Sequence, residues 1–431
     1  MGSSGFGFGI ETEYLLVRRK IDEISGAHEV SPLWIHDLDA EDLMAICDGI
    51  DTKDFNHDGL NQKPLHNSIH HYLIEGYTIS DEEMTPLKIL PKGIEARTPI
   101  FDSIEKSVEC MVALHDRLNL ALEAAGMSTA IISHHPTECE FDAPRNYRRD
   151  DYWHWARTVT ATYGSDFNIS VPDRIAAEFD LVALDARVNY YMPALIALSL
   201  SAPIFKGQLW QADLSDVEKG GRVDRLKAAR SMPGRRIGKS IRTFRRSECA
   251  PAFYIHEKPS LRFEFKGFEM SRDTTDYHGY FLLCLALLLD ETLEGKATDK
   301  ERIESLRDIA VTGLQSATVR ARAAIVIDRA AAIGQGLGMD VSSLDSLWRR
   351  LETRRLPAEE IIQTFELSGG NMSTTLKSLH GFVTTAVPVK DKVAVAASAS
   401  GNANKPAQAD ASSELEPASA AQLSTALMSS M

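Results

Sequence analysis

The run GFGFGIETEYLL at residues 5–16 places two glutamates inside an otherwise apolar segment. Successive side chains of a β-strand point to opposite faces, so Glu11 and Glu13 would share one face while Ile10 and Tyr14 share the other. Like charges about 7 Å apart repel by about 2 kcal/mol at an effective dielectric of about 20. We therefore expect a strand whose charged face meets compensating positive charge.

Two later segments show the same alternation. Glu95 and Arg97 share a face in KGIEARTPI, and Arg262, Glu264 and Lys266 share a face in SLRFEFKGFEM. Such strands would form a sheet with an apolar back and a charged front that holds cations. Carboxylate oxygens are ligands for Mg²⁺ or Mn²⁺, and the interspersed basic residues suit phosphate or a substrate carboxylate. A solvated polar sheet surface remains the alternative interpretation of this pattern.

Helical and strand-like segments are interspersed without a regular strand–helix rhythm. This favours an α+β fold with a curved, mostly antiparallel sheet and helices packed on its outer face. The first strong helix is expected to begin with Asp102 and Glu105 in capping-box spacing. The expected strands are 8–17, 92–98, 127–134, 161–171 and 260–270, and the expected helices are 103–125, 181–200, 277–293 and most of 300–365.

The 431 residues, 44% of them hydrophobic and 25% charged, have ordinary globular composition. We expect a catalytic α+β domain over residues 1–295 and a helical C-terminal region over 296–384. Residues 385–431 are rich in alanine, serine and proline and nearly lack large apolar side chains. Such a segment buries too little surface to offset ordering entropy, which predicts a disordered tail.

Charge and composition argue against several functional classes. A net charge of −14 is the wrong sign for a protein that neutralises nucleic-acid phosphates. The apolar stretches 192–205 and 281–289 are too short to span a bilayer, and no secretory signal is visible. Five scattered cysteines suit reduced thiols, so a cytoplasmic location is expected. The oligomeric state stays open, a homo-oligomer included.

An ordered set of short motifs resembles the glutamate–cysteine ligase superfamily. GIETEYLL is similar to the opening motif of that family, KGIEARTPI to its second acidic strand, and SLRFEFKGFEM to its late acidic strand. ARVNYYMPALIALSLSAPIFKG at residues 186–207 resembles a helix motif of the family and is the most specific match. The resemblance covers roughly residues 5 to 295 and implies a glutamine-synthetase-like catalytic sheet.

The resemblance implies an ATP-dependent carboxylate–amine ligase. ATP would phosphorylate a substrate carboxylate, and an amine would displace phosphate to form a gamma-glutamyl-type amide. Glutamate or a related amino acid is the expected carboxylate substrate. Phosphoryl transfer needs charge neutralisation more than covalent help, and bound Mg²⁺ or Mn²⁺ ions would supply it. Two alternatives stay open: a two-metal phosphohydrolase, and a non-catalytic nucleotide-binding descendant of the ligase fold.

Site residues follow from the resemblance position by position. Arg97 would contact phosphate or substrate. GSDFNIS matches a strand on which the family has a metal-binding histidine, with Asp166 at that position and Asn168 two residues on. Lys266 stands where the family has an arginine, and the two are not equivalent in bidentate recognition. The implied metal ligands are Glu11, Glu13, Glu95, Asp166 and Glu264; Arg97, Arg242 and Lys266 are the implied catalytic residues; and Asn168, Arg235 and Arg242 are the implied nucleotide contacts.

Residues 220–246 are strongly basic in an acidic protein. A solvated loop is one interpretation. A mobile loop whose arginines clamp the ATP phosphates is the other, and Arg242 in KSIRTF is the best match to the nucleotide-contacting arginines of the family. Elsewhere, His66 and His70 are four apart but lack an HExxH pattern, so a structural or substrate-lining role is expected.

Overall fold

The computed structural model describes residues 5–21, 28–83, 85–138, 141–142, 144, 160–209, 253–256 and 261–384. The chain divides into two compact units, Met1–Thr385 and Ala386–Met431, and all described residues belong to the first. The expected tail and the basic segment 220–246 lie outside the described residues.

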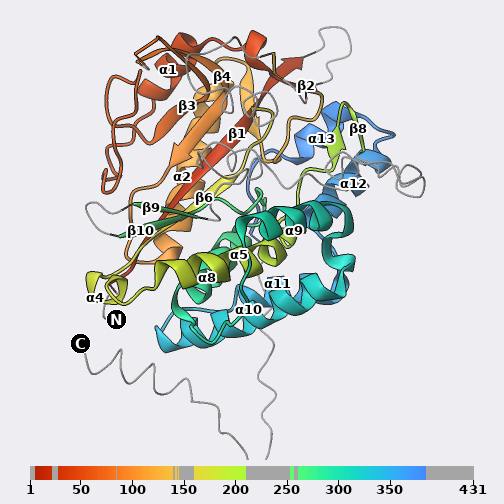
Figure 1. Ribbon diagram of the computed structural model, residues 1–431. Helices are drawn as coiled ribbons and strands as arrows, with labels where there is room; N and C mark the ends of the chain where they lie inside the picture. The colour runs from red at the N-terminus through yellow and green to blue at the C-terminus, as the bar shows by residue number, and fades with distance from the viewer. Residues whose placement is uncertain are drawn as a thin grey trace, which may run out of the picture. The chain divides into compact units, whose positions relative to one another are not determined.

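The main sheet of the first unit has the strand order β3-β4-β1-β6-β10-β9, with β2 and β5 also paired to β1 (Figure 1). These neighbouring strands pair antiparallel, and the sheet curls into a half-barrel. This confirms the predicted α+β class. The strands are β1 (Gly7–Ile21), β2 (His28–Pro32), β3 (Tyr72–Ser80), β4 (Pro86–Arg97), β5 (Met127–Ala130), β6 (Ser165–Ser170), β9 (Phe253–His256) and β10 (Arg262–Phe265); β7 (Ile204–Phe205) and β8 (Gln208–Leu209) form a separate pair.

Strand β1 is the axis of the sheet and runs past β4 and β6 (Figure 1). It is longer than the 8–17 predicted, because its second half also pairs with β2 and β5. Phe8, Ile10 and Tyr14 are fully buried on its apolar face. The alternation that predicted a charged front therefore operates as expected along β1.

Helices cover the apolar back of the sheet. The back-face side chains Phe167 and Phe263 belong to one buried core with the helices α5 and α8. Helix α8 is apolar nearly all round, as a helix packed on several sides requires. In the described part of the chain, the helices before residue 290 are α1 (Ala40–Asp48), α2 (Ile104–Glu123), α4 (Asp173–Ala176), α5 (Leu181–Ala197) and α8 (Thr274–Leu289), with a short 3-10 turn at Ile35–Asp37.

The C-terminal part of the first unit is helical, as predicted. Its helices share the core behind the sheet, where Leu306, Val326 and Leu347 pack with residues of α5 and α8. Among the described residues, we find no helix with the length and apolarity that a membrane crossing requires. The elements are α9 (Asp299–Thr312), a 3-10 turn at Gly313–Gln315, α10 (Ala317–Gly336), α11 (Leu344–Thr353), α12 (Pro357–Leu367) and α13 (Met372–Ser378).

Three local expectations differ from the structure: the cap of α2, the end of β5 and the end of β10. Helix α2 is capped by Ser103, whose hydroxyl accepts from the Lys106 backbone N–H at 3.3 Å, while Asp102 pairs with the Lys106 side chain instead. Strand β5 ends at Ala130 because the next backbone N–H donates to the Leu379 carbonyl rather than to the sheet.

Strand β10 ends at Phe265, well before residue 270. A Cβ at Gly267 would lie 1.8 Å from the Met192 side chain, so the chain there leaves the sheet to pack closely on α5. Sequence patterns also do not predict β3, a strand that pairs with β4 along most of its length.

Candidate functional site

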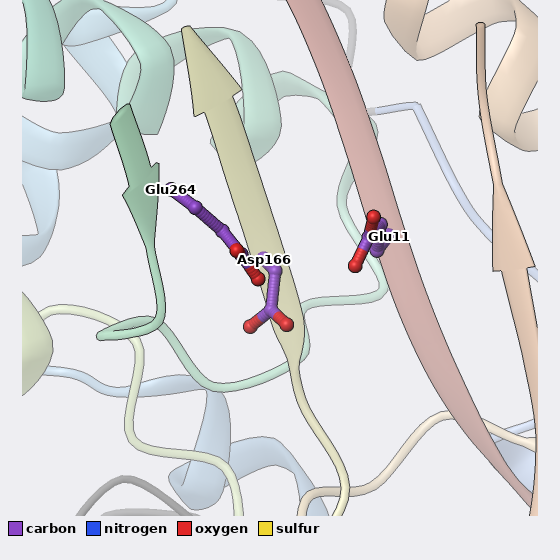
Figure 2. Close-up of side chains that lie close together, drawn as sticks. All are labelled: Glu11, Asp166 and Glu264. Carbon is purple, nitrogen blue, oxygen red and sulfur yellow. The ribbon is translucent and has the colours of Figure 1, made fainter. Parts of the chain in front are cut away.

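Three carboxylates from neighbouring strands meet on the charged face of the sheet (Figure 2). Glu11 lies on β1, Asp166 on β6 and Glu264 on β10, and an oxygen of each lies within 4.8 Å of the others. Glu11 stands opposite Asp166 in the β1–β6 ladder, and Glu264 stands opposite Asn168 in the next. Asp166 and Glu264 are buried and Glu11 is half-buried. We name Glu11, Asp166 and Glu264 the first acidic cluster.

A lysine supplies positive charge to the first acidic cluster. The Lys266 ammonium lies 2.5 Å from Asp166 Oδ2 and also pairs with Glu264 Oε1. Its side chain is 13% exposed and follows directly after the end of β10. The cation therefore lies just beyond the end of β10, where it neutralises carboxylates of the cluster.

Asn168 borders the same cluster. It lies two residues from Asp166 on β6, so both side chains are on the same face, and it is 3% exposed. Its Oδ1 atom is buried and accepts no hydrogen bond from any residue that the structure describes. A buried carbonyl oxygen without a donor costs free energy. Amide oxygens are ligands of the same hard type as carboxylates, so Asn168 has the chemistry to take part in holding a divalent cation on this face.

A second acidic cluster lies beside the first. It consists of Glu13 on β1, Glu75 on β3 and Glu95 on β4, whose oxygens again lie within 4.8 Å of one another. Glu13 stands opposite Glu95 in the β1–β4 ladder. The carboxylates expected on one face are thus gathered in two groups, with Glu11 and Glu13 of the same strand belonging to different groups.

Lys92 pairs with the second acidic cluster. Its Nζ lies 2.8 Å from Glu13 Oε2 and 3.8 Å from Glu75 Oε1, and it donates to the Thr162 carbonyl at 2.5 Å. The same atom lies 5.0 Å from the centre of the Tyr163 ring. Burial lowers the pKa of the Lys92 ammonium below its usual value, while the carboxylates of Glu75 and Glu95 act in the opposite direction.

In comparisons by sequence, no protein-family model and no curated protein matches the chain. Solved structures do match. A glutamate–cysteine ligase from Francisella tularensis in complex with AMP superimposes with a TM-score of 0.50 and 12% identity, over 87% of this chain and 88% of that chain. The chain has the fold of a glutamate–cysteine ligase. This confirms the fold that the resemblance of the motifs implied.

Two further solved structures are similar to the chain. A bifunctional glutathione synthetase from Pasteurella multocida matches with a TM-score of 0.50 and 13% identity, over 88% of this chain. The chain spans only 51% of that enzyme. A complex of the prokaryotic ubiquitin-like protein Pup with its ligase PafA gives a TM-score of 0.48 at 11% identity, over 88% of this chain and 72% of that chain.

Within the glutamate–cysteine ligase fold, Arg97 is held by a loop. It is 1% exposed, and its terminal nitrogens donate to Asn61 Oδ1 at 3.2 Å and to the backbone carbonyls of Asn61 and His70 at 3.1 and 2.7 Å. Burial lowers its pKa, against the attraction of Glu95 and Glu11. The guanidinium therefore fastens residues 61–70 to the end of β4 beside the first acidic cluster.

The remaining predicted residues fall into two groups. Arg235 and Arg242 lie outside the described residues. The histidines that suggested metal spacing make other contacts: His66 Nε2 accepts from the Ile74 backbone N–H at 3.1 Å, and His70 pairs with Asp48 at 3.0 Å. Both contacts fit a structural role, which is one of the two roles predicted for these histidines.

Sequence reasoning missed Lys92, although the residue was visible in PKGIEAR. Regular alternation would place it on the apolar face with Ile94 and Ala96. Two neighbouring signals were available: a proline before it and a glycine after it, which together are typical of a distorted strand.

A cavity of about 550 Å³ lies elsewhere, between α11, α12 and the segment after β10. Ile131, Arg272, Arg349 and Glu360 are among its lining residues. No member of either acidic cluster lines it. Because both groups of carboxylates gather on the charged face of the main sheet, we place the candidate site there rather than at this cavity.

Proposed function

We propose that the chain is an ATP-dependent ligase that joins a carboxylate to an amine. The observation that carries the proposal is the convergence of Glu11, Asp166 and Glu264 on one face of a sheet with the glutamate–cysteine ligase fold. Clustered carboxylates next to a basic side chain suit a reaction in which phosphate charge must be neutralised. Glutamate or a related amino acid is the proposed carboxylate substrate.

The first acidic cluster would hold the divalent ion. The donor set fits Mg²⁺ or Mn²⁺, because it combines three carboxylates with the unsatisfied amide oxygen of Asn168. When bound, such an ion neutralises phosphate oxygens and orients the transferring group. Glu11, Asp166, Glu264 and Asn168 position it from three neighbouring strands, which keeps the site rigid.

Lys266 would act on the phosphates in this proposal. Once a cation balances Asp166 and Glu264, the lysine side chain is released from them and can contact the transferred phosphoryl group. Arg235 and Arg242 are the proposed partners of the remaining ATP phosphates. Arg97, fastened between β4 and the loop 61–70, would keep that loop against the site.

The reaction would proceed in two steps, phosphorylation of the carboxylate and displacement of phosphate by the amine. A carboxylate oxygen of the substrate attacks the γ-phosphorus of ATP, and ADP leaves. The amine nitrogen then attacks the acyl carbon, phosphate leaves with the oxygen that came from the carboxylate, and the nitrogen loses a proton. The charged face would stabilise the phosphates in both steps through fixed charges.

A screen of amino acids and amines for stimulated ADP release tests the function. We expect ADP release that requires Mg²⁺, one amino acid and one amine together. Asp166→Asn should lower the rate by at least about 100-fold, because it removes a fixed charge from the reaction centre. Asp173→Asn, the same change at an exposed position of α4, should leave the rate unchanged. Thermal melts of each variant verify folding.

Two outcomes would contradict the ligase assignment. Phosphate release at full rate without an amine indicates a phosphohydrolase. Nucleotide binding without turnover under any combination of substrates indicates a non-catalytic binding protein.

A further inference from the structure

The two acidic clusters differ in how their positive charge is held. In the second acidic cluster the Lys92 ammonium contacts Glu13, Glu75 and the Thr162 carbonyl, and the side chain is 5% exposed. A carbonyl oxygen and carboxylates around one nitrogen satisfy an ammonium group, which carries three donors. The positive charge of this cluster is therefore the ammonium group of Lys92, which is buried among the residues that it contacts.

The backbone is shaped to place Lys92 there. The β3–β4 register passes from Glu75 opposite Gly93 to Gly76 opposite Pro91, so Lys92 is the extra residue of a β-bulge. A bulge re-aims a side chain, and here it turns Lys92 from the apolar face to the acidic face.

Two glycines make this bulge sterically feasible. A Cβ at Gly76 would lie 2.1 Å from the Leu90 carbonyl oxygen, and a Cβ at Gly93 would lie 2.2 Å from the Tyr14 carbonyl oxygen. Backbone atoms cannot move aside cheaply, so both positions require glycine. The Tyr163 hydroxyl also holds the backbone of the bulge, because it donates a hydrogen bond to the Lys92 carbonyl at 3.1 Å.

The first acidic cluster lacks such an arrangement. Lys266 lies beyond the last residue of β10, and its side chain is more exposed than that of Lys92. Beside it, the buried Asn168 Oδ1 has no donor among the described residues. Asn168 shares a face with Asp166 and stands opposite Glu264, so its unsatisfied oxygen is a feature that a bound cation would complete and that the Lys266 ammonium, paired with Asp166 and Glu264, leaves unmet.

We propose that Lys92 is a built-in cation that closes the second acidic cluster to metal ions, so that the sheet binds divalent cations at the first acidic cluster alone. A second ion placed among Glu13, Glu75 and Glu95 would lie next to the ammonium and be repelled by it. Glu13 and Glu95 would then position Lys92 instead of ligating metal, which differs from the role expected from the sequence. The inference rests on the proposed function for the identity of the ion.

Titration of the purified full-length chain with Mn²⁺ alone, followed by the electron paramagnetic resonance signal of free Mn²⁺, tests this. We expect about one ion per chain. Asp166→Asn should weaken binding by at least about tenfold, and Glu95→Gln should leave it within about twofold. The two variants make the same loss of one charge, each in a different cluster, so they control for each other.

Lys92→Met extends the test, because removal of the ammonium should raise the stoichiometry to about two ions per chain. If Lys92→Met does not fold, the comparison of Glu95→Gln with Asp166→Asn still decides. Binding of about two ions to the unmodified chain, equal weakening by Glu95→Gln and Asp166→Asn, or no binding to the unmodified chain overturns the inference. The readout does not involve turnover, so loss of the ligase proposal in the ADP screen and loss of this inference are separate outcomes.

Discussion

At the residue scale, several buried titratable side chains have partners that affect their charge state. Lys92 and Lys266 lie among carboxylates that would otherwise repel one another. The terminal nitrogens of Arg97 donate to backbone carbonyls of the loop 61–70. His135 is held by backbone groups on both ring nitrogens: Nε2 lies 3.2 Å from the Leu33 carbonyl oxygen, and Nδ1 accepts from the Glu138 N–H at 2.9 Å.

His135 gives a pH prediction. Burial lowers its pKa to about 3, from a usual value of 6.5, and protonation of Nδ1 would face the Glu138 N–H. Because the unfolded chain binds the proton more tightly, stability is complete above about pH 6.5 and falls as the pH drops toward 3. The loss attributable to His135 between pH 7 and pH 5 is about 2 kcal/mol.

Urea unfolding of the unmodified chain and His135→Gln at both pH values measures this. The variant should be less stable at pH 7 by about 1–3 kcal/mol, since it breaks buried hydrogen bonds, but less sensitive to acid. An unchanged pH dependence in the variant would show that the imidazole does not carry the effect.

Strand register decides at the element scale which side chains meet. The alternation in residues 5–16 predicts β1 and its charged face, because a period of two is local information. The contact between Glu11 and Asp166 is not local, since it depends on β6 pairing with β1. Only the resemblance to a ligase family placed the two residues in one site. Lys92 could not be placed by alternation, because its bulge shifts the period by one residue.

Strand β3 shows the same limit. Its Tyr77, Thr78 and Ile79 are good strand formers, but Glu75 and Gly76 interrupt the alternation at the register shift. The strand-forming residues therefore indicate a strand, but the register shift that orients Lys92 breaks the alternation by which a strand is recognised in the sequence.

The bulge gives a prediction for the elements. Gly93→Ala should destabilise the chain by about 1–3 kcal/mol, because the new methyl group meets the Tyr14 carbonyl oxygen. Gly336→Ala is the matched control: this glycine ends α10 and is exposed, and a methyl group added there would have no neighbouring atom within 4 Å. That change should stabilise the chain by about 0.5 kcal/mol. Denaturant midpoints compare the two, and equal effects would show that the bulge tolerates a side chain.

One apolar core joins the sheet to the C-terminal helices at the scale of the whole molecule. Phe281 on α8 packs edge-on against Phe8 and Phe167 of the sheet, and the same core reaches Val326 on α10. Arg350 on α11 adds a buried ion pair with Asp276 on α8, in which Arg350 Nη2 donates to the two carboxylate oxygens at 2.9 and 3.0 Å. The proposed catalytic region 1–295 therefore shares its core with the helices that follow it.

Truncation tests how far the region 1–295 is independent. A chain ending at residue 295 should fail to fold, because α5 and α8 would lose the helices that cover them. A chain ending at residue 385 should melt within a few degrees of the full chain, as the composition of the tail predicts. Thermal melts of the two truncated chains, followed by circular dichroism, test both expectations. A cooperative transition in the chain that ends at residue 295 would show that 1–295 is an autonomous domain.

The source of the oxygen in the released phosphate tests the central claim most directly. ATP turnover in water enriched in ¹⁸O, with Mg²⁺ and the amino acid and amine found in the screen, is followed by mass spectrometry of the phosphate. A ligase transfers a substrate carboxylate oxygen, so the account predicts phosphate without ¹⁸O. Phosphate that carries one ¹⁸O from water would mean direct hydrolysis of ATP and would contradict the account.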